Sequence, residues 1–147
     1  MTSFRIAVAK WGVFVDINPP LTNNDRAAFI EQLKIACGRV SDQEDRSVLL
    51  DLRRVDVVGD PSERVNAYVG IARIIGARRI AVVVSSEPAA SRLSEALDTA
   101  GLLNPSRILV VALGEPHPLA SALRWVDEGV DPYGAPSDSS QKPEFAP

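Results

Sequence analysis

Cysteine and histidine are nearly absent from this chain, whose 147 residues include one of each, Cys37 and His117. A single cysteine cannot form an internal disulfide, and these two residues alone make a poor ligand set for zinc. One histidine between two prolines also gives little support to a Ser-His-Asp triad. We therefore expect a reducing compartment and no structural metal, with Cys37 acting as a small buried hydrophobic residue.

Phosphate-binding loops are missing too, since neither Gly-x-Gly-x-x-Gly nor Gly-x-x-x-x-Gly-Lys occurs. Because α/β folds of this kind often carry nucleotides, the absence of phosphate-binding loops leads us to expect no bound cofactor. Lysine is scarce as well, with none between Lys34 and Lys142. A two-component receiver would need a lysine late in the chain and a phosphoacceptor aspartate ending a central strand. Asp51 instead lies inside its predicted strand, so this class is excluded.

Long apolar runs and an excess of positive charge are the remaining absences. A net charge of −3 and a pI of about 5.2 give no electrostatic basis for binding nucleic acid. No apolar stretch approaches the length of a membrane span, and the N-terminal apolar run is too short for a signal peptide. With 46% hydrophobic and 24% charged residues, the chain has the composition of one globular domain. We expect a soluble, cytoplasmic protein with no membrane span.

Hydrophobic spacing predicts a hairpin followed by a helix at the N-terminus. Apolar residues alternate over 4–9 and again over 13–17, with Lys10-Trp11-Gly12 as the turn between two antiparallel strands. From about residue 23 to residue 40 the apolar spacing changes to every third or fourth position, which predicts a helix. Its expected buried stripe consists of Ala27, Ile30, Leu33, Cys37 and Val40.

The stretch from Ser47 to Ser86 has the pattern of one βαβ unit. The run from Val48 to Leu52 is apolar except for Asp51, which is typical of a strand covered on both faces. Asp60-Pro61-Ser62-Glu63 predicts a helix start, with Asp60 capping the free amides and Glu63 reaching back as in a capping box. The helix would end at Gly76, and the β-branched run 80–84 would form the next buried strand.

Three further elements complete the predicted fold. Ser85 or Ser86 would cap a helix ending at Gly101, and a strand is expected over 108–113. The segment 115–118, Glu-Pro-His-Pro, would open a last helix with Leu119, Leu123 and Val126 or Trp125 facing inward. The order ββαβαβαβα predicts an α/β fold with three layers, in which a mixed sheet contains an N-terminal antiparallel hairpin and three parallel strands. We expect a single domain over 1–129 and a flexible, Pro- and Ser-rich tail over 130–147.

Polar side chains follow the carboxyl ends of the predicted parallel strands, the edge where open α/β sheets bind ligands. The residues expected at this edge are Arg53, Arg54, Asp56, Asp60, Ser62, Ser85, Ser86, Glu115 and His117. Hydroxyl groups at helix N-termini beside two arginines favour an anion. The alternative interpretation is that Asp60, Ser85 and Ser86 only cap helices.

With this order of elements, the chain resembles the STAS domains, the family of anti-sigma-factor antagonists and sulfate-transporter domains, and within it the stand-alone SpoIIAA-like proteins. The resemblance covers about residues 4–126, and its best stretch runs from Val48 to Ser62, where a strand ending in Asp-Leu-x-x-Val precedes a helix start. Residues 76–84 resemble the family's glycine-led entry into the next strand. Family antagonists are phosphorylated on a serine of Asp-Ser-Ser-Gly at this helix start. The corresponding residues here are Gly59-Asp60-Pro61-Ser62-Glu63, with Ser62 as the phosphoacceptor candidate.

Two main hypotheses about function follow, besides a homodimer built through a sheet edge with no switch. The resemblance implies a non-enzymatic regulatory module of the bacterial cytoplasm that binds another protein beside the helix starting near Pro61 and is switched at Ser62. The alternative is a carrier of a small apolar or anionic ligand, or an enzyme, that uses Arg53, Ser85, Ser86 and His117. A partner-binding module should expose apolar residues beside that helix. A carrier should enclose an apolar pocket of some hundreds of Å³.

Overall fold

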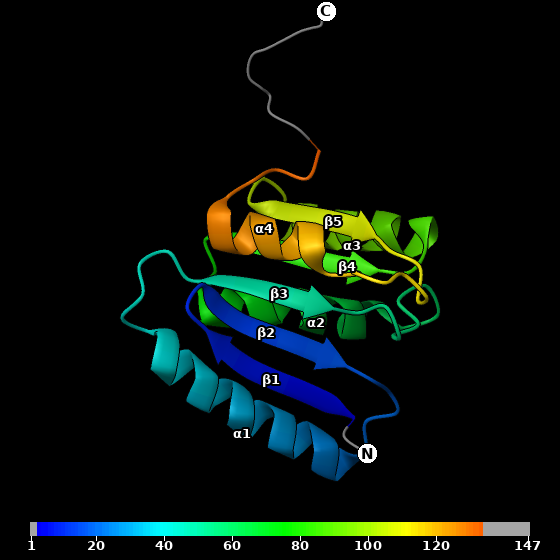
Figure 1. Cartoon of the computed structure of the whole chain (residues 1–147). Helices are drawn as coiled ribbons and strands as arrows, with labels where there is room; N and C mark the ends of the chain where they lie inside the picture. Colours follow the sequence, from blue (N-terminus) through cyan, green and yellow to red (C-terminus); the bar gives the residue numbers. More distant parts are fainter. Residues whose placement is uncertain (1–2, 134–147) are drawn as a thin grey trace, which may run out of the picture.

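The computed structural model describes residues 3–133, in which five strands and four helices follow one another in the predicted order (Figure 1). The strands are β1 (Phe4–Ala9), β2 (Gly12–Ile17), β3 (Ser47–Asp51), β4 (Arg79–Val84) and β5 (Ser106–Val110). The helices are α1 (Asn23–Val40), α2 (Ser62–Ile75), α3 (Glu87–Thr99) and α4 (Ala120–Glu128). The strands form one sheet in the order β1-β2-β3-β4-β5, with β1 antiparallel to β2 and the other neighbours parallel. The predicted α/β fold class is confirmed.

The β1–β2 hairpin turns tightly because glycine occupies the start of β2. Gly12 has a φ of +146°, and a Cβ atom there would lie 1.9 Å from the carbonyl oxygen of Ser47 on the neighbouring strand. Only glycine allows this close approach of the two backbones. The turn therefore fixes the register in which β2 pairs with β3, with Gly12 opposite Ser47.

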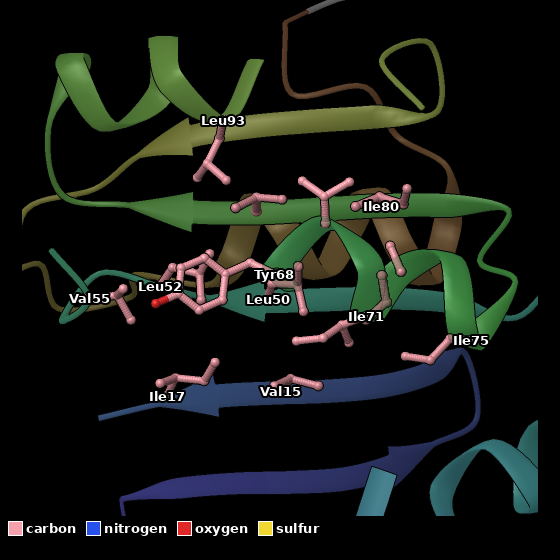
Figure 2. Packing of buried hydrophobic residues seen from close by; sticks show 14 of the residues in the cluster. Val15, Ile17, Leu50, Leu52, Val55, Tyr68, Ile71, Ile75, Ile80 and Leu93 are labelled. Carbon is pink, nitrogen blue, oxygen red and sulfur yellow. The ribbon is translucent and has the colours of Figure 1, made fainter. Parts of the chain in front are cut away.

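The two faces of the sheet carry different layers. Helices α1, α2 and α3 share one large core cluster with the sheet, and part of it is drawn in Figure 2. Its central strand residues are fully or almost fully buried, as the 0–2% exposure of Val15, Leu50 and Val82 shows. Helix α4 forms a smaller cluster on the other face with Leu49, Ala81 and Val83. The successive residues of β3 and β4 alternate between these clusters, which explains why both strands are apolar throughout.

Helix α1 buries a narrower stripe than its sequence predicts. Its buried residues are Leu33, Ala36 and Val40, whereas Ile30 is 54% exposed and Cys37 is half-buried. The helix packs on β1 and β2 at one side of the sheet. Because this contact is one-sided, apolar residues on the flank of α1 stay in solvent, and the placement of Ala27 and Ile30 in the core was wrong.

The elements after α3 begin and end at other residues than predicted. Strand β5 spans Ser106–Val110 rather than 108–113, and α4 begins at Ala120 instead of near Glu115. Residues 115–119 form a loop because each proline disfavours helical conformation in the residue before it, His117 before Pro118 included. Leu123, expected to face inward, is 38% exposed.

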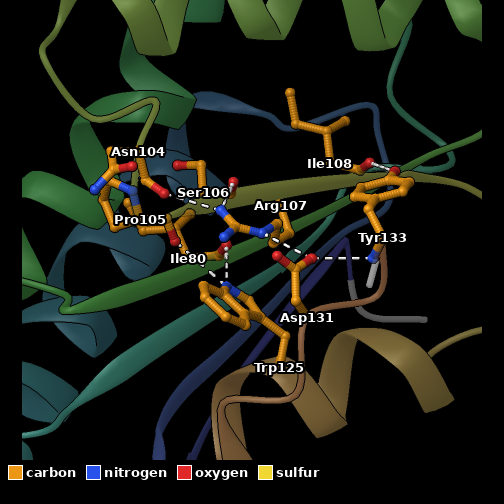
Figure 3. A network of polar contacts seen from close by, with 9 residues as sticks. All are labelled: Ile80, Asn104, Pro105, Ser106, Arg107, Ile108, Trp125, Asp131 and Tyr133. Atoms are coloured by element: carbon orange, nitrogen blue, oxygen red, sulfur yellow. Dashed lines mark hydrogen bonds and ion pairs between the residues drawn. The ribbon is translucent and has the colours of Figure 1, made fainter. Parts of the chain in front are cut away.

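The chain after α4 returns along the outer strand β5 (Figure 3). Arg107 at the start of β5 forms an ion pair of 3.1 Å with Asp131 and stacks on Trp125, with its Cζ 4.2 Å from the ring centroid. The Tyr133 hydroxyl donates to the carbonyl of Ile108. The first residues of the predicted tail therefore contact the sheet, and its remainder, 134–147, lies outside the described residues. Within 3–133, no helix has the length and apolarity needed to cross a membrane.

Candidate functional site

The loop that joins β3 to α2, residues 52–61, is held in part by turns within its own segment. The Val55 amide donates to the Leu52 carbonyl at 3.1 Å, and the Asp60 amide donates to the Asp56 carbonyl at 2.9 Å. The Asp56 carboxylate accepts the Gly59 amide at 3.0 Å, closing a further turn. Hereafter this segment is the β3–α2 loop. Of the valines in this loop, Val55 and Val57 enter the core, whereas Val58 is 52% exposed.

Arg92 of α3 holds this loop from outside it. A single guanidinium nitrogen, Nη1, donates to the carbonyls of Val57 at 2.7 Å and Val58 at 2.8 Å, and also to that of Asp60. Hydrogen bonds from a charged donor are stronger than those between neutral groups. Three carbonyl groups that would otherwise need water are thus tied to α3, which makes the loop a defined surface.

Tyr68 of α2 anchors the end of the loop. Its hydroxyl donates to Oδ2 of Asp60 at 2.8 Å, and its ring is buried to 8% exposure. Burial and the hydrogen bond to Asp60 both raise the pKa of Tyr68. Arg64 lies 3.7 Å from Oδ1 of Asp60. Asp60 therefore has two partners on α2 itself.

The predicted cap at the start of α2 was wrong. The helix begins at Ser62, its N-cap residue is Pro61, and no side chain caps it. Asp60 turns to Tyr68 and Arg64 instead of to the first helical amides. No side chain accepts from the first amides of α2, although the Arg64 amide donates to the Pro61 carbonyl at 3.0 Å, and the Ser62 side chain beside them is exposed.

Arg53 is placed where it cannot serve as a surface contact. It is 7% exposed and forms a bidentate pair with Asp51, with distances of 2.9 Å from Nε to Oδ1 and 2.8 Å from Nη2 to Oδ2. Asp51 itself is 3% exposed. The pair neutralises two charges inside the carboxyl edge of the sheet, and Arg54 is the arginine of this edge that faces solvent.

Asp16 lies beside this pair, directly opposite Asp51 in the parallel register of β2 and β3. Its Oδ1 atom is buried and has no hydrogen-bond partner among the described residues. Burial, followed by the charge of Asp51, raises the pKa of Asp16, while Arg54 and Arg5 act in the opposite direction. The edge thus contains a poorly solvated carboxylate that motif analysis did not identify.

The other predicted site residues lie apart from the β3–α2 loop in the chain. Ser86 is the N-cap of α3 and accepts the Ala89 amide at 3.3 Å, as the capping interpretation predicts, and Ser85 is exposed. His117 is exposed in the loop before α4. Arg54, Asp56, Asp60 and Ser62 are the predicted residues that one local segment brings together.

Open hollows formed by the described residues include two that lie away from this loop. One of about 680 Å³ is lined by Trp11, residues 42–45 and Asp127, at the end of the sheet where β2 and β4 begin. The other, of about 520 Å³, lies between the end of α3 and Arg107 at the start of β5. Neither is an enclosed apolar pocket, and neither is lined by a predicted site residue. Within residues 3–133, no three His, Cys, Asp or Glu side chains are grouped to hold a metal ion.

Sequence reasoning missed Arg92, Tyr68 and Asp16. Arg92 reaches a loop 32–35 residues away in the chain, which no local pattern reveals. The sequence pattern places Tyr68 only in the predicted helix and does not indicate the hydrogen bond of its hydroxyl to Asp60.

Comparison of the chain with models of protein families, with curated proteins and with solved structures finds no match.

Proposed function

We propose that this protein is a STAS-like interaction module that binds another protein through the β3–α2 loop and the start of α2, and that phosphorylation of Ser62 regulates the binding. The observation that carries the proposal is the position of Ser62. Its side chain is exposed at the first residue of α2, directly after a loop held by Arg92. The order of elements and the stretch from Val48 to Ser62 are the features that this chain shares with the STAS pattern.

The exposed part of the loop has the composition of a contact surface. Val58 is 52% exposed and is flanked by Arg54, Asp56 and Pro61, which are exposed as well. A fixed loop loses little conformational entropy on binding, so an apolar residue at its tip contributes more net affinity than it would on a mobile segment. Ile74, 65% exposed, is a second exposed apolar residue of α2, near the C-terminal end of the helix.

A phosphate on Ser62 would change the charge of this surface sharply. The uncapped amides and dipole of the helix stabilise negative charge at this position. Arg64, which already lies 3.7 Å from Asp60, supplies a nearby cation, whereas Asp60 and Glu63 oppose the added charge. The modified loop would keep its fold but present a dianion to a partner that binds the neutral hydroxyl.

The small-ligand alternative has less support. Arg53 is engaged with Asp51, Ser86 caps α3, and the two hollows lie away from the predicted contacts. No specific arrangement of side chains at the carboxyl edge, within the part of the chain that the structure describes, selects a substrate.

The experiment compares partner binding by five tagged forms expressed in the organism's own cells. Wild type and Ser62→Ala are expected to copurify with the same protein, while Ser62→Glu and Val58→Asp lose it by at least about tenfold. Ser91→Glu places the same charge on an exposed part of α3 and should bind as wild type does. Equal binding by Ser62→Glu and Ser91→Glu would contradict the proposed switch, and retention by Val58→Asp would contradict the proposed surface.

A further inference from the structure

Strand β5 is the last strand in the order of the sheet, so one of its sides faces away from β4. The Val111 amide donates to the Val84 carbonyl at 2.8 Å, which shows that Val111 turns its backbone amide toward β4. Successive residues of a strand in a parallel pair turn their backbone groups to alternate sides. Ile108 and Val110 therefore direct their amide and carbonyl groups to the outer edge, where another strand could pair with them.

The sequence along this edge is apolar without interruption. Six apolar residues follow one another from Ile108 to Leu113, and the run contains no charge, proline or glycine. Val110 is 40% exposed and Leu113 is 56% exposed. Exposed segments of this composition pair readily with a second chain, and natural proteins cover them or interrupt them with charges. A cover over this edge is therefore expected.

The chain after α4 supplies a cover for the first half of the edge. Hereafter residues 129–133 are the strap. It leaves α4 at Gly129, whose φ of +73° is left-handed, and passes beside the start of β5 (Figure 3). The Tyr133 hydroxyl donates to the carbonyl of Ile108, which is one of the groups that point outward. The strap thus occupies a position that an added strand would need.

Arg107 fixes the strap on β5. Its Nε atom lies 3.1 Å from Oδ1 of Asp131, and the same Asp131 oxygen accepts the Tyr133 amide at 2.9 Å. The Arg107 guanidinium also stacks on Trp125 of α4, with its carbon 4.2 Å from the ring centroid. The side chains of Arg107 and Asp131 are only 23% and 26% exposed, so water screens their attraction incompletely. The position of Tyr133 at the edge therefore depends on Asp131.

We propose that the strap keeps β5 from pairing with β5 of a second copy, and that release of Asp131 and Tyr133 turns this edge into a dimer interface. The strap is then a device that sets the assembly state of the protein. It is separate from the proposed Ser62 surface, because β4 lies between β5 and β3 in the sheet.

The residues of β5 suit pairing with their own copies. Two strands related by a two-fold axis run antiparallel, and a pair centred on Ile108 places each Ile108 opposite the other. Each Ile108 amide would then donate to the carbonyl that the Tyr133 hydroxyl now occupies. Arg107 would lie opposite Leu109 of the second copy, so no like charges meet across the pair.

Sedimentation equilibrium of the purified full chain tests the proposal. Over a roughly hundredfold range of concentration, Asp131→Ala with Tyr133→Ala should dimerise with a dissociation constant at least about tenfold lower than that of wild type. Asp42→Ala removes a carboxylate from the exposed loop between α1 and β3 and should behave as wild type does. A double variant that associates no more than wild type would overturn the proposal, as would equal association by Asp42→Ala.

A further substitution shows whether the association uses β5. Val110→Lys, added to the double variant, places a charge on the exposed edge and should return self-association to the wild-type level. In the double variant, amide hydrogen exchange at Ile108 and Val110 should be at least about tenfold slower in concentrated than in dilute solution. Association that Val110→Lys leaves unchanged would overturn the assignment to β5.

Tyr133→Phe provides the test if circular dichroism shows that the double variant does not fold. This variant loses the hydroxyl that bonds the Ile108 carbonyl but keeps the ion pair of Arg107 with Asp131. It should lower the dissociation constant of the dimer several-fold, because one outward carbonyl group becomes available to a second copy. A dissociation constant equal to that of wild type would overturn the role of Tyr133 in covering the edge.

Discussion

At the scale of single residues, the carboxyl edge of the sheet is dominated by charges that are partly or wholly buried. Asp51 and Arg53 are 3% and 7% exposed and satisfy one another with two side-chain hydrogen bonds. A buried pair of this kind is weak evidence for net stabilisation, because removing two ions from water offsets their attraction. It is sensitive to the loss of one member, which leaves the other charge buried and alone.

Replacing Arg53 by Met should therefore destabilise the protein by about 3–5 kcal/mol. Replacing both residues, Asp51→Val with Arg53→Met, should recover more than half of that loss because no unpaired charge remains. Urea denaturation followed by circular dichroism measures both free energies of unfolding. A double variant less stable than Arg53→Met would show that Asp51 and Arg53 stabilise the fold by more than the neutralisation of each other's charge.

Asp16 should make stability depend on pH. Its pKa in the folded protein is raised above the ordinary value of 3.8, so folding favours the neutral carboxyl group. The contribution is fully favourable below pH 3.8 and is lost as the pH rises through the folded pKa. Asp16→Asn should then be more stable than wild type at pH 7, by on the order of 1 kcal/mol, with the difference shrinking toward pH 4. Denaturation at the two pH values measures this, and an Asp16→Asn variant less stable than wild type at pH 7 would contradict it.

At the scale of elements, the β3–α2 loop depends on a helix that is distant in sequence. Arg92→Ala should raise the rates of amide hydrogen exchange in residues 55–62 by at least about tenfold, because three carbonyl groups lose a charged donor. Arg73→Ala is a matched control, since Arg73 donates to the Ala100 carbonyl and does not touch the loop. Equal exchange in the two variants would mean that the loop is fixed by its own turns alone.

The elements also show what sequence patterns can specify. The alternation in β1 and β2 and the apolar runs of β3 and β4 predicted these strands correctly, because a two-residue period leaves few alternatives. The expected burial holds for β2, β3 and β4, whereas Val8 of β1 is 38% exposed. The buried residues of α1 were harder to predict, since a helix lying over only two strands buries Leu33 and Ala36 and leaves Ile30 in solvent. The start of α2 was predicted at the right place, but its cap was wrong, because Asp60 bonds Tyr68, eight residues further on, instead of the nearest amides.

At the scale of the whole molecule, the helices cover the two faces of the sheet unequally. Three helices cover one side of the sheet, and α4 covers part of the other. The candidate site was predictable as far as the strand ends could be placed, and Arg54, Asp56, Asp60 and Ser62 do lie in one segment. The burial of Arg53 and the bare side of β1 and β2 could not be predicted, because both depend on how the elements pack across the sheet.

Intact-mass spectrometry under native conditions, on protein purified from its own cells, tests whether Ser62 is a modified switch on a partner-binding surface. We expect a population heavier by one phosphate that maps to Ser62, together with a protein complex formed by the unmodified population alone. A chain carrying no modification at Ser62 would contradict the switch. A phosphorylated form retained in the same complex would show that the charge at Ser62 does not control binding.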